Sequence, residues 1–533
     1  MTLSQDAGPA SPSLPGHTIG AALRLAAERH GDREALVSVQ QGHRFTYREL
    51  DGAVDDVSRG FVAAGVGKGD RVGIWSPNCT EWLLVQYATA RIGAILVTIN
   101  PAYRSHELAY VLQQSGASLL VSAEGFKGSS YRKMVAEVAP ALRTVYLGTP
   151  DWDALLVPTG EIPDRGLLAD DPINIQYTSG TTGFPKGATL SHRNILGNGF
   201  LVGALCGYTE LDRVCVPVPF YHCFGMVMGN LGALTHGACV VIPAPSFDPA
   251  ATLSAVALER CTSLYGVPTM FIAELAEPTF SSYDLTSLRT GIMAGSPCPV
   301  EVMKQVQLFM PEVTICYGMT ETSPVSTQTT ADDSLDRRVS TVGRVHPHVE
   351  VKVVDPATGD VVERGTTGEF CTRGYSVMLG YWDDPARTAE AIDADGFMHT
   401  GDLAVMDAAG YLSIVGRIKD LVIRGGENVY PREVEEFLYT HPDVLDAQVV
   451  GVPDPRYGEE LCAWVRVRPG AALTPDELRE WCRGKLAHFK VPRYIRFTDE
   501  FPMTITGKVQ KFKMRETSVA ELGLQAAAAI VTA

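Results

Sequence analysis

Short, nearly continuous runs of Val, Ile and Leu recur along most of the chain up to about residue 400, with helical patterns between them. Such runs are typical of strands buried on both faces of a parallel sheet, because helices then cover both faces. Many of the runs end in Gly, Pro or Ser, and sites in such sheets form where the strands end. Strands are therefore predicted at residues 71–75, 94–99, 118–121, 173–177, 213–218, 238–242, 263–266, 288–293 and 314–317.

The pattern changes twice towards the C-terminus. From about residue 343 apolar and polar positions alternate, as at 349–354, which predicts antiparallel strands of a small barrel or sheet. After Gly416 the chain has the pattern of a compact α+β unit, in which Pro431 can open a helix and Thr474 to Glu477 form a capping box. We expect a flexible lead over 1–16, a large α/β domain over 17–416 with a β-rich, barrel-like subdomain at about 343–416, a boundary at 417–420, and an α+β domain over 421–533.

Composition limits the classes of partner. The chain has 533 residues, enough for about two to four structural units, and a formal net charge of −16. An acidic surface repels nucleic acid and anionic lipid, so neither is an expected partner. No apolar run approaches the ~20 residues of a membrane span. The 11 cysteines form no C-x-x-C pair and the N-terminus has no signal pattern, so we expect free thiols in a cytoplasmic protein.

The strongest local motif runs from Tyr177 to Gly187, directly after a predicted strand. Its glycines let backbone N–H groups turn inward, its hydroxyls add donors for phosphate oxygens, and its lysine supplies a positive charge. The alternative is a Gly/Thr-rich surface loop. The Walker A pattern cannot be laid on it, which disfavours ordinary P-loop chemistry. The candidate phosphate-binding residues are Thr178, Ser179, Gly180, Thr181, Thr182, Gly183 and Lys186.

This segment resembles the phosphate loop of the AMP-forming adenylating enzymes, which include acyl-CoA synthetases, peptide-synthetase adenylation domains and luciferases. Segments resembling the family's other motifs follow in order at 317–322, 400–402, 416–420 and 502–508. Within the family, the stretches 221–223, 294–297, 380–382, 424–431 and 488–492 are most similar to medium-chain fatty acyl-CoA synthetases. The resemblance covers nearly the whole chain, from about residue 45 to about residue 515.

The resemblance implies a two-step ligase. A carboxylate first reacts with ATP to give acyl-AMP and pyrophosphate, and the acyl group then passes to coenzyme A. Mg²⁺ is the implied metal cofactor, with Glu321 as its ligand, because a carboxylate oxygen suits that hard ion. Thr320 would donate to the phosphates, and Lys508 would be the catalytic lysine of a mobile C-terminal domain. Lys419 would occupy the hinge between the two domains.

The resemblance also assigns the nucleotide site. Asp402 would accept the ribose hydroxyls, although a turn-capping role is its alternative. Arg417 would contact ribose or phosphate with its planar fork. For Tyr317, core packing competes with a place beside the base. The residues expected around the adenine are Gly295, Ser296, Pro297, Tyr317 and Gly318.

The acyl chain is expected beside residues 219–229, which follow a predicted strand. His222, Phe224, Gly225 and Met319 are the predicted pocket residues, whereas Met226 and Met228 fit a pocket and a packed core equally well. This segment has no Arg, Lys or Asp to pair with a second substrate charge, which predicts a medium-length aliphatic acid first and a small aryl acid second. Gly425 and Gly426 would line the coenzyme A tunnel, where small residues permit close approach.

Other classes of function compete with this interpretation. The chain could load a carrier protein instead of coenzyme A, oxidise its adenylate as luciferases do, or bind nucleotide without catalysis. The presence of Glu321, Asp402 and Lys508 disfavours the last of these. The sequence leaves the acid, the oligomeric state and the pathway open.

Overall fold

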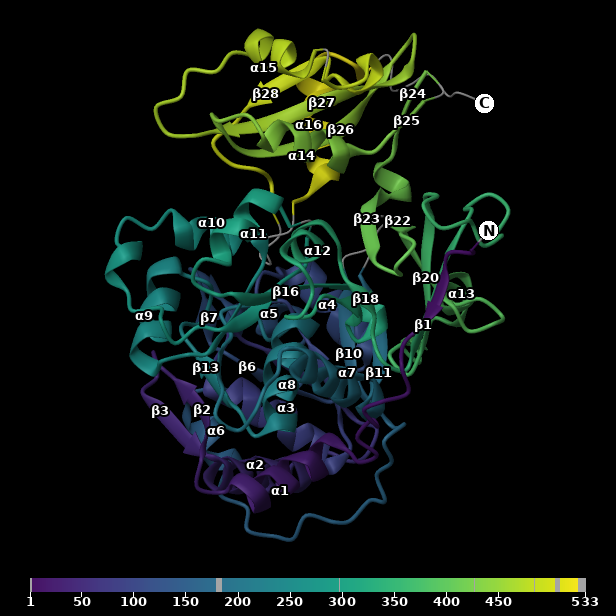
Figure 1. The fold of residues 1–533 in the computed structure, drawn as a ribbon. Helices are drawn as coiled ribbons and strands as arrows, with labels where there is room; N and C mark the ends of the chain where they lie inside the picture. Colours follow the sequence, from purple (N-terminus) through teal and green to yellow (C-terminus); the bar gives the residue numbers. More distant parts are fainter. Residues whose placement is uncertain are drawn as a thin grey trace.

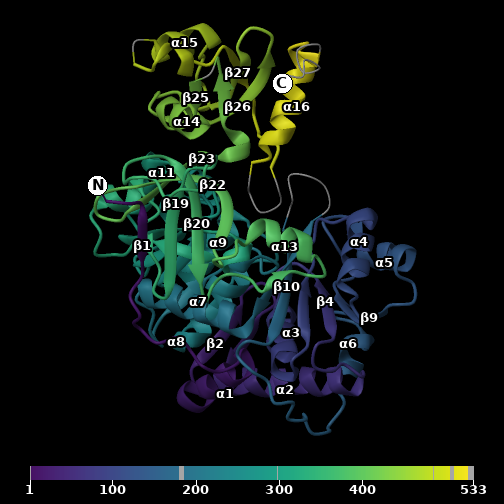
Figure 2. The ribbon, with the colours of Figure 1, turned by 90° about the vertical axis from the view of Figure 1, so that its right-hand side faces the viewer.

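The computed structural model describes residues 2–178, 185–296, 298–425, 427–483, 485–503 and 509–525. A large N-terminal domain carries a smaller C-terminal domain over one of its ends (Figure 1). Helices α1 (Ile19–His30) and α2 (Tyr47–Ala63) lie at the opposite end, as Figure 2 also shows. Within the described residues no helix combines the length and the apolar character needed to cross a bilayer.

Two large sheets with parallel central strands organise the N-terminal domain. The seven-stranded sheet has the order β21 (Gly380–Tyr381), β11 (Lys186–Ser191), β10 (Pro172–Thr178), β5 (Ile95–Thr98), β4 (Arg71–Trp75), β6 (Leu119–Ser122) and β9 (Arg143–Tyr146). The nine-stranded sheet has the order β18 (Arg344–Val345), β17 (Val325–Gln328), β16 (Glu312–Gly318), β15 (Thr290–Met293), β14 (Ser263–Gly266), β12 (Arg213–Cys215), β13 (Cys239–Ile242), β2 (Glu34–Ser38) and β3 (His43–Thr46).

All the strands predicted from buried apolar runs are present, and each pairs in parallel with at least one neighbour. The runs at 71–75 and 263–266 match β4 and β14 residue for residue. Val72, Ile74 and Trp75 of β4 are fully buried, as expected for a central strand covered on both faces.

Helices cover the sheets, and α3 (Thr80–Ile92) is buried almost all round. It packs against α1 and α2 on one side, while Gln86 and Tyr87 donate to backbone carbonyls of residues 226 and 230 on the other. A helix enclosed on all sides needs no polar face. The other helices of this domain are α4 (Ser105–Ser115), α5 (Tyr131–Val138), α6 (Pro150–Leu155), α7 (His192–Leu205), η1 (Phe224–Leu231), α8 (Gly232–His236), α9 (Pro249–Glu259), α10 (Pro268–Leu275), η2 (Phe280–Ser282), α11 (Val300–Val306), η3 (Thr320–Thr322), α12 (Leu335–Ser340) and α13 (Pro385–Ala391). A small hairpin joins β7 (Gly125–Phe126) to β8 (Ser129–Ser130).

A third, antiparallel sheet forms the β-rich subdomain. Its order is β1 (Gln5–Ala7), β19 (Val349–Val354), β20 (Gly368–Gly374), β22 (Met398–Met406) and β23 (Leu412–Arg417). In this order β1 and β23 are the two ends, so the subdomain is an open sheet and not a closed barrel.

The expectation of a flexible lead over 1–16 is wrong for residues 5–7. Gln5, Asp6 and Ala7 pair with β19, and the backbone N–H of Ser4 donates to the carbonyl of Val362 at 2.8 Å. The free edge of β19 offers backbone groups that any extended segment can satisfy. A strand held in this way needs no apolar pattern, so the residue pattern does not indicate it.

The C-terminal domain is a mixed sheet with helices. The strand order is β25 (Glu427–Val429), β24 (Val422–Arg424), β27 (Gly458–Val467) and β26 (Val444–Asp454), and β28 (Tyr494–Phe497) adds to β27 in parallel. Its helices are α14 (Pro431–Tyr439), α15 (Pro475–Cys482), η5 (His488–Lys490) and α16 (Lys511–Glu521). The predicted capping box at Thr474 is confirmed, because its side chain accepts from the backbone N–H of Glu477. The short helix η4 (Ile418–Asp420) links the two domains.

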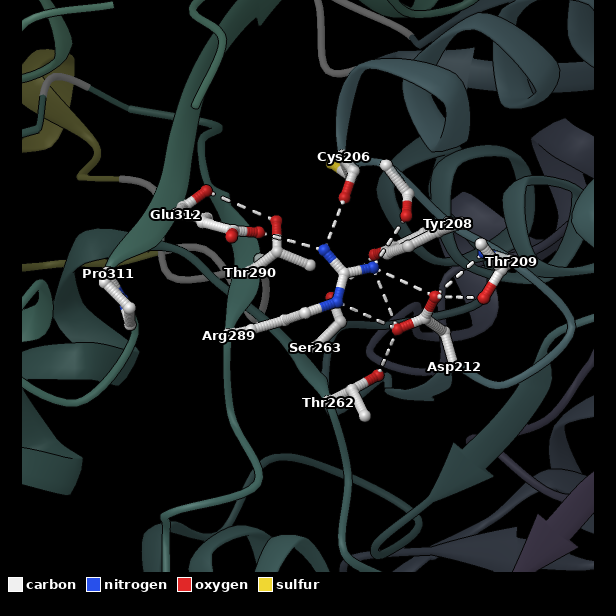
Figure 3. A network of polar contacts seen from close by, with 12 residues as sticks. Cys206, Tyr208, Thr209, Asp212, Thr262, Ser263, Arg289, Thr290, Pro311 and Glu312 are labelled. Carbon is white, nitrogen blue, oxygen red and sulfur yellow. Dashed lines mark hydrogen bonds and ion pairs between the residues drawn. The ribbon is translucent and has the colours of Figure 1, made fainter. Parts of the chain in front are cut away.

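Arg289 ties together the amino ends of several strands of the nine-stranded sheet (Figure 3). It directly precedes β15, and its guanidinium donates to Asp212 at 2.9 Å and to Glu312 at 2.9 Å. Asp212 precedes β12 and also accepts from Thr262, which precedes β14, at 2.6 Å. Burial opposes the charge of Asp212, but Thr262, Arg289 and the backbone N–H of Thr209 together lower its pKa.

Arg289→Ala should lower the free energy of unfolding at neutral pH by about 3 kcal/mol, because it leaves a carboxylate that is 4% exposed without its cation. A lowered pKa means that this contribution is present above the unfolded value and is lost as pH falls through the folded value. Urea denaturation at neutral pH and at a series of values below the ordinary Asp pKa of 3.8 measures both effects. Arg483→Ala, which removes an exposed pair with Glu480, is the control and should change stability by less than about 0.5 kcal/mol. Equal losses in the two variants would contradict the prediction.

Candidate active site

Asp402 joins strands from two sheets. The Tyr317 hydroxyl, at the end of β16, donates to Asp402 Oδ2 at 2.7 Å, and Arg417 Nε donates to Asp402 Oδ1 at 3.0 Å. Asp402 and Arg417 are also cross-strand partners in β22 and β23. Asp402 is 7% exposed, and each carboxylate oxygen keeps acceptor capacity beyond these bonds. The structure thus brings together three residues that the sequence predicted for one nucleotide site.

Tyr317 has a more specific place than the sequence suggested. Its ring packs edge-on against Phe370 with the centroids 5.2 Å apart, and its hydroxyl is committed to Asp402. Burial and the neighbouring carboxylate of Asp402 raise the pKa of Tyr317 well above its usual range. The phenol therefore stays protonated and holds the carboxylate in one orientation.

A second cluster surrounds Glu321, which lies in η3 four residues after Tyr317. Glu321 Oε1 accepts from the Tyr381 hydroxyl at 2.9 Å, and the Thr178 hydroxyl lies 3.5 Å away. Lys186 Nζ lies 4.8 Å from the centre of the Tyr381 ring. Glu321 is 5% exposed, so its charge is held among these groups. Thr178 thus lies at the Glu321 carboxylate, and Lys186 lies over the ring of Tyr381, which donates to the same carboxylate.

Backbone geometry explains two of the glycines predicted around the adenine, Gly318 by close packing and Gly295 by its positive φ. A Cβ at Gly318 would lie 1.7 Å from the carbonyl oxygen of Pro324, so no side chain fits there. Gly295 is exposed and has φ +89°, a conformation that glycine adopts without strain. Ser296 follows it and is half-buried.

The predicted acyl segment is held against the phosphate-loop strand. Gln176 of β10 donates to the carbonyl of Tyr221 at 2.6 Å and accepts from the Cys223 thiol at 2.6 Å. His222 and Phe224 are half-buried, and the Phe224 ring stacks on Tyr265 with the centroids 5.5 Å apart. The segment is therefore fixed two residues before Thr178.

The continuation of this segment, η1, is a π-helix of 8 residues. Its carbonyls at Met226 and Met228 accept from Gln86 Nε2 and from the Tyr265 hydroxyl, each at 3.1 Å. Short π-helices occur often at functional sites, and here buried donors from α3 and β14 satisfy the backbone. Met226 and Met228 are 1% and 2% exposed and belong to the largest apolar core, which favours core packing for both.

Gly225 does not offer a side-chain position in an acyl pocket. A Cβ there would lie 2.4 Å from the carbonyl oxygen of Pro219. A larger side chain at this position would therefore meet the backbone and not an open pocket, and the placement of Gly225 itself beside the acyl chain stays a prediction. Met319 is half-buried and packs against the same core as Phe224.

Several predicted site residues lie outside the described residues. They are Ser179, Gly180, Thr181, Thr182, Gly183, Pro297, Gly426 and Lys508. Of the remaining residues, Thr320 is the first residue of η3 and Lys419 is exposed within η4. Gly425 has φ +60°, and a Cβ added there would lie 3.1 Å from the Tyr457 ring.

Tyr381 is the site residue that the sequence reasoning missed. The sequence places it in the similar stretch 380–382, which indicates no role for its side chain. Its strand β21 pairs with β11 directly after the phosphate loop, which places the hydroxyl on Glu321. Only this antiparallel pairing across nearly 200 residues of chain would have indicated the contact.

Glu369, Cys371 and His399 place one potential ligand atom each within 4.8 Å of one another. His399 already contacts Glu369 through Nδ1 at 2.9 Å and Asp393 through Nε2 at 3.4 Å. Lys352 Nζ lies 3.3 Å from the same Asp393 carboxylate. These cationic and hydrogen-bonding groups already satisfy the two carboxylates, so we assign no metal to this cluster.

Comparison with known proteins agrees with this geometry. The sequence profile described as AMP-binding enzyme matches residues 23–382, and the one described as AMP-binding enzyme C-terminal domain matches residues 433–508. A protein of Bacillus subtilis named putative acyl-CoA synthetase YngI is 50% identical, covering 94% of this chain and 97% of its own length. The mitochondrial medium-chain acyl-CoA ligase ACSF2 of Danio rerio is 45% identical, covering 98% of this chain and 92% of its own length.

Solved structures share the whole fold. The anthranilate CoA ligase AuaEII with anthranoyl-AMP superposes with a TM-score of 0.88 at 26% identity, covering 96% of this chain and 99% of that one. ATP-bound MatB from Rhodopseudomonas palustris superposes with a TM-score of 0.85 at 32% identity, covering 94% of this chain. The apo form of MatB superposes with a TM-score of 0.76 at 32% identity, covering 95% of this chain. Each match covers 99% of the MatB chain. Matches to both domain profiles and to relatives along nearly its full length show that the chain belongs to the AMP-binding enzyme family.

Proposed function

We propose that this chain is an AMP-forming acyl-CoA synthetase, which converts a carboxylic acid and ATP to acyl-AMP and pyrophosphate and then transfers the acyl group to coenzyme A. The observation that carries the proposal is the pair of buried carboxylates, Glu321 and Asp402, linked through the end of β16 and its following turn. Lys186 lies over the ring of Tyr381, whose hydroxyl donates to Glu321, and Arg417 donates to Asp402. The names of the two relatives described above support the same activity.

The first step brings two anions together, so cations and donors must surround the reacting atoms. Lys186 stands at the start of β11, directly after the phosphate loop, and is suited to pair with phosphate oxygens. Asp402 is held by Tyr317 and Arg417 and is suited to accept the ribose hydroxyls. Lys508 and the loop hydroxyls, including Thr181 and Thr182, complete the proposed set.

The oxygen donors around Glu321 fit Mg²⁺, which prefers carboxylate, hydroxyl and phosphate oxygens. We propose that Glu321 would hold the ion. When bound there, Mg²⁺ neutralises part of the charge on the phosphates. Tyr381 donates to Glu321 and thereby orients the carboxylate, and Thr320 precedes it at the start of η3.

The second step requires access for a thiol. We propose that the small domain turns about Lys419 and that Gly425 and Gly426 face the pantetheine arm. The proposed compartment is the cytoplasm, where the free state of all eleven cysteines fits reducing conditions.

We propose a medium-chain aliphatic acid as the substrate, and a small aryl acid as the second choice. His222, Phe224 and Met319 remain the proposed wall residues, and no Arg, Lys or Asp occurs between residues 219 and 229. A second charge on the acid would find no partner in this segment, and burial without a partner is costly.

The acid is tested with a panel of carboxylates, measuring AMP release with and without coenzyme A. For saturated monocarboxylates, each added methylene should raise kcat/KM about fourfold, the equivalent of about 0.8 kcal/mol, until the pocket ends. AMP release should depend on coenzyme A. A preference for dicarboxylates or amino acids would contradict the assigned acid, and faster turnover with a carrier protein would contradict the assigned acceptor.

Lys508→Ala should slow acyl-AMP formation by about 10²–10³-fold, the usual loss when one transition-state donor is removed. Thioester formation from supplied acyl-AMP and coenzyme A should change far less. Stopped-flow detection of pyrophosphate measures the first step, and thiol consumption measures the second. Lys513→Ala, which removes an exposed lysine of α16, is the control, and equal losses in both steps would contradict the assignment.

Glu321→Gln should reduce adenylation by about 10²-fold and raise the Mg²⁺ concentration needed for half-maximal rate, because it removes the charge that attracts the ion. Tyr381→Phe removes only the hydrogen bond to the carboxylate and should cost about tenfold. Magnesium titrations of the adenylation rate compare the two variants. An unchanged magnesium requirement in Glu321→Gln would rule Glu321 out as the ligand.

A further inference from the structure

Helix α14 of the small domain contacts the large domain. Figures 1 and 2 both place it on the face turned towards α11. Arg432 Nη1 donates to the carbonyl of Ile414 in β23 at 2.5 Å, and Arg432 Nε lies 3.8 Å from Glu436 Oε1 one turn later. The two side chains are only 19% and 30% exposed, although they lie at the boundary of the two domains.

Glu436 reaches the amino end of α11. Burial is the main effect that raises its pKa, while Arg432 and the backbone N–H of Val300 favour its charged form. Val300 is the first residue of α11, which follows the adenine segment at Gly295 and Ser296. Ile414 lies in the strand that leads to Arg417. Arg432 therefore contacts β23, and Glu436 lies where the amino end of α11 favours its charge, so the pair adjoins the two segments that flank the proposed nucleotide site.

The residue directly before Glu436 points into its own domain. Glu435 is 4% exposed, and its Oε1 accepts from the backbone N–H of Val449 at 2.8 Å and from Lys511 Nζ at 2.6 Å. Lys511 is the first residue of α16. One turn of α14 thus connects the large domain on one side with the start of α16 on the other.

Lys511 also stands at the base of the lysine loop. The backbone N–H of Gln510 donates to the carbonyl of Pro502 at 2.8 Å, and Met503 forms an isolated bridge with Val509. Both ends of the chain around residues 504–508 are therefore fixed next to Lys511, three residues after Lys508. Any shift of α14 moves the base of this loop with it.

The arrangement of the two domains agrees better with one state of a relative than with another. The superposition on MatB is closer for its ATP-bound form, with a TM-score of 0.85, than for its apo form, with 0.76. The conformation that contains the α14 contacts is therefore closer overall to ATP-bound MatB than to apo MatB.

We propose that Arg432 and Glu436, together with the Glu435–Lys511 pair, are positioning residues for adenylation. The first pair holds the small domain over the nucleotide site, and the second fixes the base of the lysine loop to the same helix. For thioester formation the first pair must separate. This inference rests on the proposed function and on the role of Lys508 in it. A purely structural role would affect both half-reactions alike.

The experiment measures each half-reaction separately and adds a readout that needs no catalysis. Arg432→Gln and Glu436→Gln should slow acyl-AMP formation about tenfold, the scale of a lost charge-assisted hydrogen bond, and leave thioester formation from supplied acyl-AMP within about twofold of wild type. Limited trypsin digestion at the exposed Lys419 should be several-fold faster in both variants, because cleavage follows the population in which the domains have separated.

Lys511→Met tests the second pair. It should slow adenylation by a similar factor while leaving cleavage at Lys419 unchanged, since the contacts between the domains remain. Arg483→Gln, which removes an exposed pair with Glu480 on α15, is the matched control and should change neither readout. Thermal unfolding midpoints show whether each variant is folded.

The outcomes separate the two proposals. Equal loss of both half-reactions, or unchanged cleavage at Lys419 in Arg432→Gln and Glu436→Gln, overturns the positioning role. If wild type releases no pyrophosphate with any acid, the proposed function fails. In that case the cleavage rates still decide whether this pair holds the domains together.

Discussion

The carboxylate of Asp402 is the point on which the arrangement of the site depends. It accepts from Tyr317 at the end of the nine-stranded sheet and from Arg417 at the end of the antiparallel sheet. Removing either donor would leave a buried charge with one partner fewer, which is costly in a protein interior. The interaction therefore fixes the antiparallel sheet against the nine-stranded sheet, and it does so one residue before the short helix that begins the C-terminal domain. The fold and the candidate nucleotide site therefore depend on the same contact.

The sequence predicted those parts of the fold that depend on burial. Strands such as β4 are apolar over their whole length because both faces are covered, so composition alone marks them. Segments held by backbone pairing gave no such signal: β1 satisfies a free strand edge, and its three residues are Gln5, Asp6 and Ala7. The barrel-like subdomain was predicted from alternation, but alternation is the same in an open sheet and a closed one.

The candidate site was predictable where a motif has its own local chemistry. Glu321, Asp402 and Arg417 stand in segments whose residue types suit nucleotide and metal, and the structure pairs Arg417 with Asp402. Tyr381 was missed because its role comes from a long-range strand pairing. At Gly225 the sequence cannot show that an added Cβ would meet the backbone of Pro219. Absence of a side chain leaves space only where the neighbouring backbone is distant.

The boundary between the two domains differs from their interiors. The apolar clusters of the N-terminal domain and those of the C-terminal domain share no residue among the described parts of the chain. The contacts identified at the boundary are polar, and Arg432 reaches across it to a backbone carbonyl that water could satisfy equally well. The proposed rotation of the small domain would therefore expose little apolar surface and exchange a few hydrogen bonds for others. Because the exchange is nearly balanced, single side chains on α14 can decide which arrangement is populated.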